Sequence, residues 1–381
     1  MSFLVRAVPL VVLLSTSAAR AADAPLDLTA QAKALYRVAA CGGNDPLPQG
    51  IDARMVDLHC RELERSVARY RTRWVDKAVP YLQNVVPSSV PATVVYPFGG
   101  GDLLTALATF PRATEITTLS LERAGDARLI DGLRGARLRT ALEENRRNVQ
   151  RLFAVAHSKT SNLSIVTKGE LPGELIFVLV ALKVHGFEPV SLKYFRLEAD
   201  GTVHYLTAAE IAAAEQAAKR KIDRQQIFAD MELQIRKAGD PKAPVVTYRH
   251  IAANLDDEHL AKDPSPINHL KKKGRVAAMT KAASYLLWWG QFSTIRSYLL
   301  ENVDWMISDS TGIPPKYAQG AGFVQETYGR FDGPFLPAGR GWSDDFKKLW
   351  KQNPYKELPF RYGYPDNARH SHMLVTRRDK K

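Results

Sequence analysis

Two stretches near the start of the chain place apolar side chains at the spacing of amphipathic helices. Residues 28–40 and 53–82 repeat apolar positions every three or four residues, with charged positions between them. The stretch 87–93 (PSSVPAT) then interrupts this pattern with two prolines. We therefore predict that residues 22–90 form a helical N-terminal segment.

A strand, a glycine turn and a helix follow directly. Residues 93–98 (TVVYPF) are mostly apolar, GGGD occupies 99–102, and apolar positions then continue to Phe110. A second strand-like stretch, EITTLSLE, covers residues 115–122. A helix that joins two strands in this way favours parallel pairing in a doubly wound sheet.

The rest of the chain alternates helical patterns with short strands. Stretches at 190–197 and 202–206 predict one hairpin, and stretches at 231–237 and 245–252 predict another. The other predicted elements are helices over 141–157, 171–187, 207–226, 280–289 and 292–302, a strand over 303–308, and closing strands over 359–364 and 371–377.

This order of elements predicts an α/β fold with a Rossmann-like, mostly parallel sheet, added hairpins and an N-terminal helical preface. We expect a Rossmann-like core over residues 91–230 and a C-terminal α+β portion over residues 231–381 that packs on it. No low-complexity linker separates the two, so one large domain and two closely packed lobes both fit the sequence.

The first 21 residues have the pattern of a secretory signal peptide. Arg6 precedes an apolar run from Ala7 to Leu14, and Ala19-Arg20-Ala21 supplies the small residues of a cleavage site. A membrane anchor is the alternative, but the run is far shorter than the roughly 20 residues that span a bilayer. We expect an exported protein, periplasmic or secreted, that is soluble and has no transmembrane segment after signal removal.

The composition is strongly basic. The formal net charge is +13, and removal of residues 1–21 takes away two arginines and no acid, which leaves +11. An exported basic protein meets anionic headgroups and acidic polymers rather than nucleic acid. We therefore predict an anionic component of the cell envelope as a partner, although a solvated surface explains most basic residues equally well.

Cysteine and histidine positions limit the covalent and metal chemistry. Cys41 and Cys60 both lie in the N-terminal segment, and in an exported chain they predict a disulfide. Free thiols or half of a metal site are the alternatives. His370 and His372 would share one face of a strand, but neither pair has a clear set of further ligands. The sequence therefore predicts no metal site.

The glycine turn is the first candidate ligand site. A dinucleotide-binding turn needs G-x-G-x-x-G after a strand and an acid about 20 residues later. Gly99, Gly101 and Glu122 meet part of this pattern, but Leu104 stands at the third glycine position. Asp102 also puts a negative charge where a phosphate would bind.

Three interpretations of this turn stay open. It could hold a cofactor such as NAD or S-adenosylmethionine, or it could be a corner in which Asp102 caps the helix. It could also contact another small ligand, cationic or hydroxylated, through the set Gly99, Gly100, Gly101, Asp102 and Glu122. No cofactor is therefore assigned.

A second candidate site follows the predicted strand 303–308. Asp309 and Ser310 combine an acid with a hydroxyl, and in a hydrolase Asp309 or Asp102 would act as the general base. Ser310 as a nucleophile would need a neighbouring base, which the sequence cannot place. The alternative is a turn whose side chains bond the local backbone.

Several motifs resemble those of a family of uncharacterised exported bacterial proteins. They are YPFGGGD at 96–102, SLE at 120–122, KAASYLL at 281–287 and DSTGIP at 309–314. The resemblance implies export and names no substrate, and the strand and glycine turn also look like methyltransferase-like folds. The chain departs from the family at Gly101, where members have proline, and at Ser120 and Arg123, which flank Leu121-Glu122. It also departs at Ser308-Asp309-Ser310-Thr311, which replaces a pair of acids.

Lys281 and Arg296 complete the candidate residues. Both lie in apolar surroundings, where a cation would contact an anionic ligand or form an internal salt bridge. We predict an exported protein that binds a cell-envelope or small-molecule ligand in a Rossmann-like crevice. A hydrolase acting on an envelope component and a methyltransferase-like transfer enzyme are the alternatives.

Overall fold

The computed structural model describes residues 24–155, 170–331, 333, 340–362 and 371–379. The predicted signal peptide, residues 1–21, lies outside the described residues, as does His370. No helix in these described ranges combines the length and the apolar character that crossing a membrane requires.

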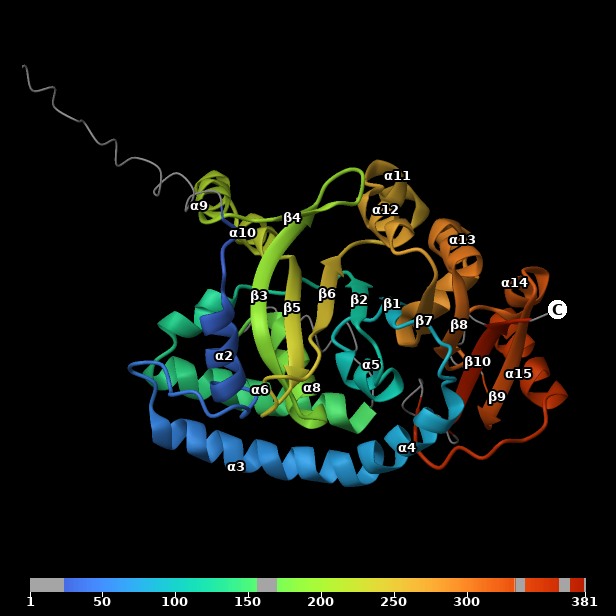
Figure 1. Cartoon of the computed structure of the whole chain (residues 1–381), viewed down its shortest axis with the longest axis horizontal. Helices are drawn as coiled ribbons and strands as arrows, with labels where there is room; N and C mark the ends of the chain where they lie inside the picture. Colours follow the sequence, from blue (N-terminus) through green and yellow to red (C-terminus); the bar gives the residue numbers. More distant parts are fainter. Residues whose placement is uncertain (1–23, 156–169, 332, 334–339, 363–370, 380–381) are drawn as a thin grey trace, which may run out of the picture.

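The described strands form one ten-stranded mixed sheet in the order β4-β3-β5-β6-β2-β1-β7-β8-β10-β9 (Figure 1). The five central strands, from β6 to β8, run parallel to one another, and the strands on either side pair antiparallel. The strands are β1 (Thr93–Pro97), β2 (Glu115–Ser120), β3 (Phe187–Leu197), β4 (Val203–Tyr205), β5 (Asp230–Lys237), β6 (Val246–Ala252), β7 (Val276–Thr280), β8 (Val303–Ser308), β9 (Phe323–Gly329) and β10 (His372–Arg378).

The sheet is therefore partly parallel, where the sequence predicted a mostly parallel one. Four of its nine neighbouring pairs are parallel and five are antiparallel. The antiparallel pairs come from the hairpins at one edge and from β10 and β9 at the other. Hairpin connections force antiparallel pairing, so the two predicted hairpins explain two of the five antiparallel pairs, β3 with β4 and β5 with β6.

Helices cover both faces of the sheet. One hydrophobic core packs α2, α3, α5 and α8 against side chains such as Val94 and Ile116, and a second packs α11, α12 and α13 against Val95 and Leu119. Successive residues of β1 thus enter opposite cores, as strand geometry requires. The helices are α2 (Thr29–Val38), α3 (Ala53–Tyr70), α4 (Asp76–Val85), α5 (Leu103–Thr109), α6 (Gly135–Val155), α8 (Gly173–His185), α9 (Ala208–Ala217), α10 (Lys221–Ile227), α11 (Asp257–Lys262), α12 (Ser265–Lys272), α13 (Ser293–Asn302), α14 (Pro315–Gly320) and α15 (Arg340–Gln352), with a π-helical segment η1 (Arg71–Val75) and 3-10 turns η2 (Ala127–Gly132), η3 (Ala282–Trp288) and η4 (Gly290–Phe292).

Several predicted elements differ from the observed ones. The predicted helix 207–226 is two helices. The first, α9, ends where Ala218 takes an extended backbone conformation, and α10 begins where the Asp223 carboxylate accepts a hydrogen bond from the backbone N–H of Arg220. Residues 359–362 of a predicted closing strand form no strand, and the rest of that prediction lies outside the described residues. Strands β7 and β9 were not predicted, and the stretch 282–288 is a 3-10 turn.

The predicted disulfide between Cys41 and Cys60 is confirmed, with a Cα–Cα distance of 5.4 Å. It ties the segment after α2 to the middle of α3, which runs along the lower edge in Figure 1. His59 lies beside the two sulfurs. Because the sulfurs are bonded to each other, they are not the thiolates that bind metal ions.

Candidate functional site

The sequence-predicted polar residues follow the parallel strands at one edge of the sheet. Asp102 follows β1, Glu122 follows β2, Lys281 directly follows β7, and Asp309 directly follows β8. The carboxyl ends of parallel strands lie at the same edge, so these residues share one edge. Strand order also reverses between β1 and β7, and in open α/β sheets ligands bind at such a reversal.

The glycine turn after β1 is a buried and closely packed corner. Gly99 donates its backbone N–H to the carbonyl oxygens of Tyr96 and Leu119 at 3.2 and 3.1 Å. A Cβ atom at Gly99 would lie 2.7 Å from the Tyr96 ring, and one at Gly101 would lie 3.1 Å from Glu174 Oε1. Gly100 has a φ of 47°, which side chains disfavour. Packing therefore accounts for Gly99 and Gly101, and backbone conformation accounts for Gly100.

The carboxylate of Asp102 is bonded on both oxygens by the protein itself. Its Oδ1 accepts hydrogen bonds from the backbone N–H and the hydroxyl of Thr105, at 3.3 and 2.7 Å, so Asp102 caps α5. Its Oδ2 accepts from the Tyr96 hydroxyl at 2.9 Å and from Lys281 Nζ at 3.1 Å. Burial raises the pKa of Tyr96 well above its ordinary value, and the Asp102 charge adds to this, so the phenol keeps its proton.

Lys281 and Asp102 form a fully buried ion pair. Their side chains are 0% and 1% exposed, and Lys281 Nζ also donates to the Thr105 hydroxyl at 3.1 Å. Of the two roles suggested for Lys281, the structure shows the internal salt bridge. The pair joins the end of β7 to the start of α5 across the strand-order reversal.

Two other acids at this edge lack such partners. Glu174, in the first turn of α8, is 1% exposed, and neither of its carboxyl oxygens has a hydrogen-bond partner. Glu122 is 9% exposed, and its Oε1 has no partner. Burial raises the pKa of Glu174 well above its ordinary value, and the charges of Glu122 and Asp102 raise it further. The three acids thus form one cluster around the glycine turn.

The backbone of Glu122 is held in place from β6. Its carbonyl oxygen lies 2.8 Å from His250 Nε2, and the other ring nitrogen of His250 lies 3.1 Å from the Thr118 hydroxyl. Burial lowers the pKa of His250, so the ring stays neutral. These hydrogen bonds fix the backbone of Glu122 and do not involve its side chain.

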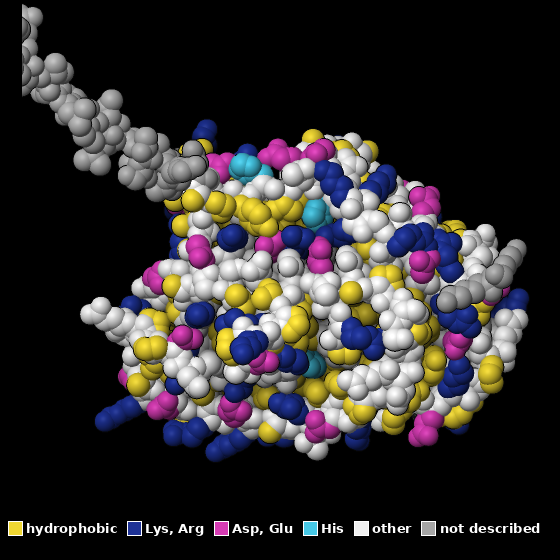
Figure 2. Space-filling view, viewed as in Figure 1, with side chains coloured by type: hydrophobic (Ala, Val, Ile, Leu, Met, Phe, Trp, Pro, Cys, Tyr) yellow, Lys and Arg dark blue, Asp and Glu magenta, His cyan; other side chains and the backbone are white. Residues whose placement is uncertain are grey.

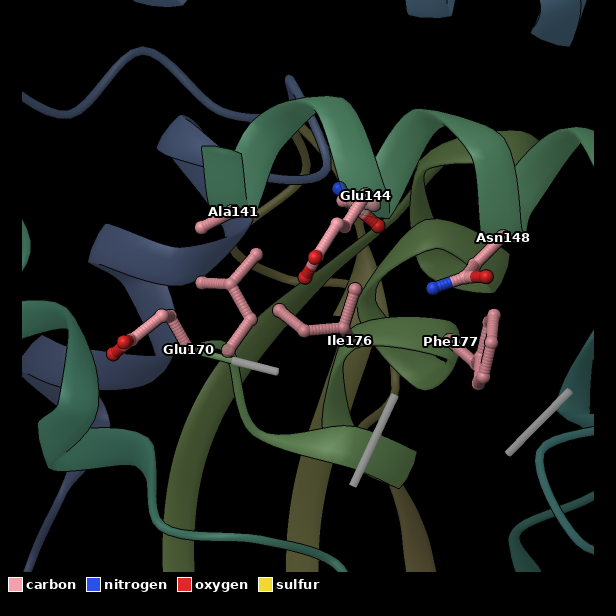
Figure 3. A pocket seen from close by; sticks show the side chains of 8 residues that line it. Ala141, Glu144, Asn148, Glu170, Ile176 and Phe177 are labelled. Carbon is pink, nitrogen blue, oxygen red and sulfur yellow. The ribbon is translucent and has the colours of Figure 1, made fainter. Parts of the chain in front are cut away.

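A small cavity lies next to the turn, between α6 and α8. Figure 3 shows Glu144 and Asn148 of α6 facing Ile176 and Phe177 of α8 across it. Its volume is about 20 Å³, which is enough for one water molecule. Phe177 both lines this cavity and packs beside Gly101.

The Asp309 loop brings a serine and a histidine together. Asp309 Oδ1 accepts from the backbone N–H of Thr311 at 2.8 Å and from its hydroxyl, which is the local turn predicted as the alternative. Ser310 Oγ lies 2.9 Å from Nε2 of His372, the first residue of β10, and both side chains are buried. The sequence contained this histidine but could not place it beside Ser310.

Arg296 supports a loop. Its Nη1 donates to the carbonyl oxygens of Leu287 and Trp289 at 2.7 and 2.9 Å, and its guanidinium lies 4.1 Å from the centre of the Tyr317 ring. These contacts hold the turn between η3 and η4 against α13 and α14. Arg296 thus stabilises the conformation of the segment that follows β7.

The fold and this edge define an α/β protein with a ten-stranded mixed sheet and a buried polar cluster at the carboxyl ends of its parallel strands. No family model, no curated protein and no solved structure matches the chain. The resemblance to exported bacterial proteins therefore stays a prediction.

Proposed function

We propose that the chain is an exported protein with a Rossmann-like core that binds a small hydroxylated or amine-bearing ligand at the carboxyl edge beside β1 and β2. Glu122 and Glu174 contact the ligand. Asp102 and Lys281 hold the glycine turn that forms one wall. A component of the cell envelope is the expected source of the ligand.

The observation that carries this proposal is the pair of acids with unpartnered buried oxygens. Buried polar atoms are nearly always hydrogen-bonded, and each exception costs about 1–3 kcal/mol. Glu122 and Glu174 together leave three carboxyl oxygens without a partner. Ligand hydroxyl groups, which both donate and accept hydrogen bonds, would pair with these oxygens, and an ammonium group would donate to Glu122.

The strand order supports the Rossmann-like classification. Along the chain the parallel strands are β1, β2, β6, β7 and β8, and their spatial order β6-β2-β1-β7-β8 matches the 3-2-1-4-5 order of doubly wound nucleotide-binding sheets. In such sheets an acid after the second strand bonds ribose hydroxyls, which is the position of Glu122. A nucleoside-bearing ligand is therefore within the proposed class, and with it the methyltransferase-like alternative.

A thermal-shift screen of the oxidised protein tests this function. The panel contains S-adenosylmethionine, NAD, adenosine, amino sugars, polyamines and peptidoglycan fragments. A ligand at about a hundredfold excess over its Kd stabilises the fold by roughly 2.7 kcal/mol. We expect Glu122→Ala to lose the shift and Glu258→Ala, the same change at an exposed site on α11, to keep it. A shift that survives in Glu122→Ala would refute the assignment.

A hydrolase is the second candidate, and the contact between Ser310 and His372 favours it. At 2.9 Å, His372 Nε2 could accept the Ser310 proton as the hydroxyl oxygen attacks an acyl carbon. His372 is thus a base in hydrogen-bonding contact with Ser310, and the predicted bases Asp309 and Asp102 bond the hydroxyls of Thr311 and Thr105. The function ranks second because Ser310 and His372 are 0% and 1% exposed, whereas Glu122 of the carboxyl-edge cluster is 9% exposed.

Ester hydrolysis by three variants tests the hydrolase. Turnover of p-nitrophenyl acetate should be lost in Ser310→Ala and in His372→Asn. It should be kept in Ser308→Ala, which removes a neighbouring hydroxyl. Equal rates in all three variants and the unchanged protein would eliminate this candidate.

A further inference from the structure

A second polar pocket lies away from the carboxyl-edge cluster, where three parts of the chain meet. It has a volume of about 380 Å³. Its walls come from the end of α3 with η1, from the last turns of α6, and from the segment before residue 363. The lining residues used below are Arg69, Arg73, Arg361, Tyr70, Trp74 and Phe153.

The pocket is lined by three arginines, and none of its described lining residues is an acid. Arg69 and Arg73 are four residues apart on one side of the helix, and Arg361 comes from the C-terminal part of the chain. In the described ranges neither Arg69 nor Arg73 has an ion pair, and Arg69 Nη2 donates to the Ser66 hydroxyl at 3.3 Å. An anion would relieve the repulsion between the like charges of Arg69 and Arg73.

Stacked aromatic rings form the rest of the wall. The Tyr70 ring stacks on Trp74 with centres 5.6 Å apart and on Phe153 with centres 4.5 Å apart. Trp74 Nε1 donates to the carbonyl oxygen of Arg361 at 2.5 Å, which fixes the third arginine's backbone against the ring stack. The Tyr70 hydroxyl is buried and has no hydrogen-bond partner. The wall therefore offers a flat apolar surface beside the arginines.

The backbone at this pocket is also unusual. Residues Arg71–Val75 form a π-helical turn between α3 and α4, a feature that occurs frequently at functional sites. Dark-blue basic side chains project along the lower edge of Figure 2, where α3 runs in Figure 1. Such a field raises the local concentration of anions.

We propose that this pocket binds an organic phosphomonoester, with the guanidinium groups of Arg69, Arg73 and Arg361 on the phosphate and the organic group beside the ring stack. Arginine suits this task because its planar fork donates two parallel hydrogen bonds to phosphate oxygens. The net positive charge of the chain is consistent with such a ligand.

Calorimetric titration with phenyl phosphate tests the pocket, because this probe combines a phosphomonoester with a flat ring. We expect Arg69→Gln with Arg73→Gln to weaken binding by about tenfold or more, since each removes a charge-assisted contact. The control, Arg65→Gln with Arg147→Gln, removes the same charge from α3 and α6 outside the pocket and should change binding by less than about threefold. Equal weakening in both double variants, or no binding of the probe, would overturn the proposal.

Two further arms separate a structural effect from binding and identify the source of the phosphate. Tyr70→Phe removes only the buried, unpartnered hydroxyl and keeps the ring stack, so both the fold and the affinity for phenyl phosphate should stay unchanged. Weaker binding in this variant would contradict the proposal that Tyr70 contributes only its ring to the pocket. Sedimentation with phosphatidylcholine vesicles containing phosphatidic acid then assigns a lipid headgroup if binding needs Arg69 and Arg73. If only phenyl phosphate binds, the ligand is a soluble phosphomonoester.

Discussion

The buried pair of Lys281 and Asp102 gives the sharpest test of how the glycine turn is held. Lys281→Met keeps the unbranched side chain to within one heavy atom and removes its charge. Asp102 then stays 1% exposed, with hydrogen bonds from Tyr96 and Thr105 but without the ammonium group. We expect the free energy of unfolding to fall markedly, because the buried carboxylate loses its counter-charge.

The size of the effect follows from the burial of both groups. Removing one partner of a buried ion pair costs about 3–5 kcal/mol. The donors that remain on Asp102 place Lys281→Met at the lower end, about 3 kcal/mol. Capping alone would be worth only about 1 kcal/mol. The double variant Asp102→Asn with Lys281→Met buries no charge at either position, so it should be more stable than the sum of the single changes implies, by about 2 kcal/mol.

Urea unfolding of the four proteins in this double-mutant cycle measures the coupling. Other contacts of Lys281 are lost in both arms of the cycle, so they cancel to first order. Additive single changes, or a loss of only about 1 kcal/mol for Lys281→Met, would show that the pair contributes no more than an ordinary helix cap.

Three other outcomes follow from the same structure. Replacing Cys41 and Cys60 by serine should lower the free energy of unfolding by about 3 kcal/mol for this 19-residue separation, measured by urea unfolding against the oxidised protein. Gly99→Ala should destabilise by about 1–3 kcal/mol because its Cβ would meet the Tyr96 ring, whereas Gly320→Ala, with nothing within 4 Å, should be neutral or stabilising; equal thermal shifts would contradict this. Because the pKa of Glu174 is raised in the folded protein, its contribution to stability is fully present below the ordinary value of 4.5 and is lost as pH rises. The difference in melting temperature between Glu174→Gln and the unchanged protein should therefore shift in favour of the variant as pH increases. Parallel pH profiles of the two proteins would refute this prediction.

The sequence predicted the elements whose signals are local. The run into the glycine turn gave β1, α5 and β2 within a residue or two, and the alternating stretches gave both hairpins. The two cysteines sufficed for the disulfide. Capping by Asp102 was also predictable, because an acid before an apolar helix is a strong N-cap signal.

Long-range contacts could not be predicted in this way. Asp102 and Lys281 are 179 positions apart, and Ser310 and His372 are 62 apart, so no local pattern joins them. Strand β7 is a short run, VAAMT, whose two alanines carry little strand propensity, and it forms where β1 and β8 pair with it. Glu174 carried one weak signal, an acid at the start of an otherwise apolar helix, and only its burial shows that it lacks a partner.

The most direct test of the proposed ligand site is the stability of Glu174→Leu with and without the ligand found by the screen. Leucine replaces an unpartnered buried acid with an apolar side chain, so the unliganded variant should melt at a higher temperature than the unchanged protein. The same variant should lose the ligand-induced shift. A variant that is less stable than the unchanged protein without ligand, or that keeps the full ligand-induced shift, would contradict the claim that Glu174 forms hydrogen bonds with a ligand.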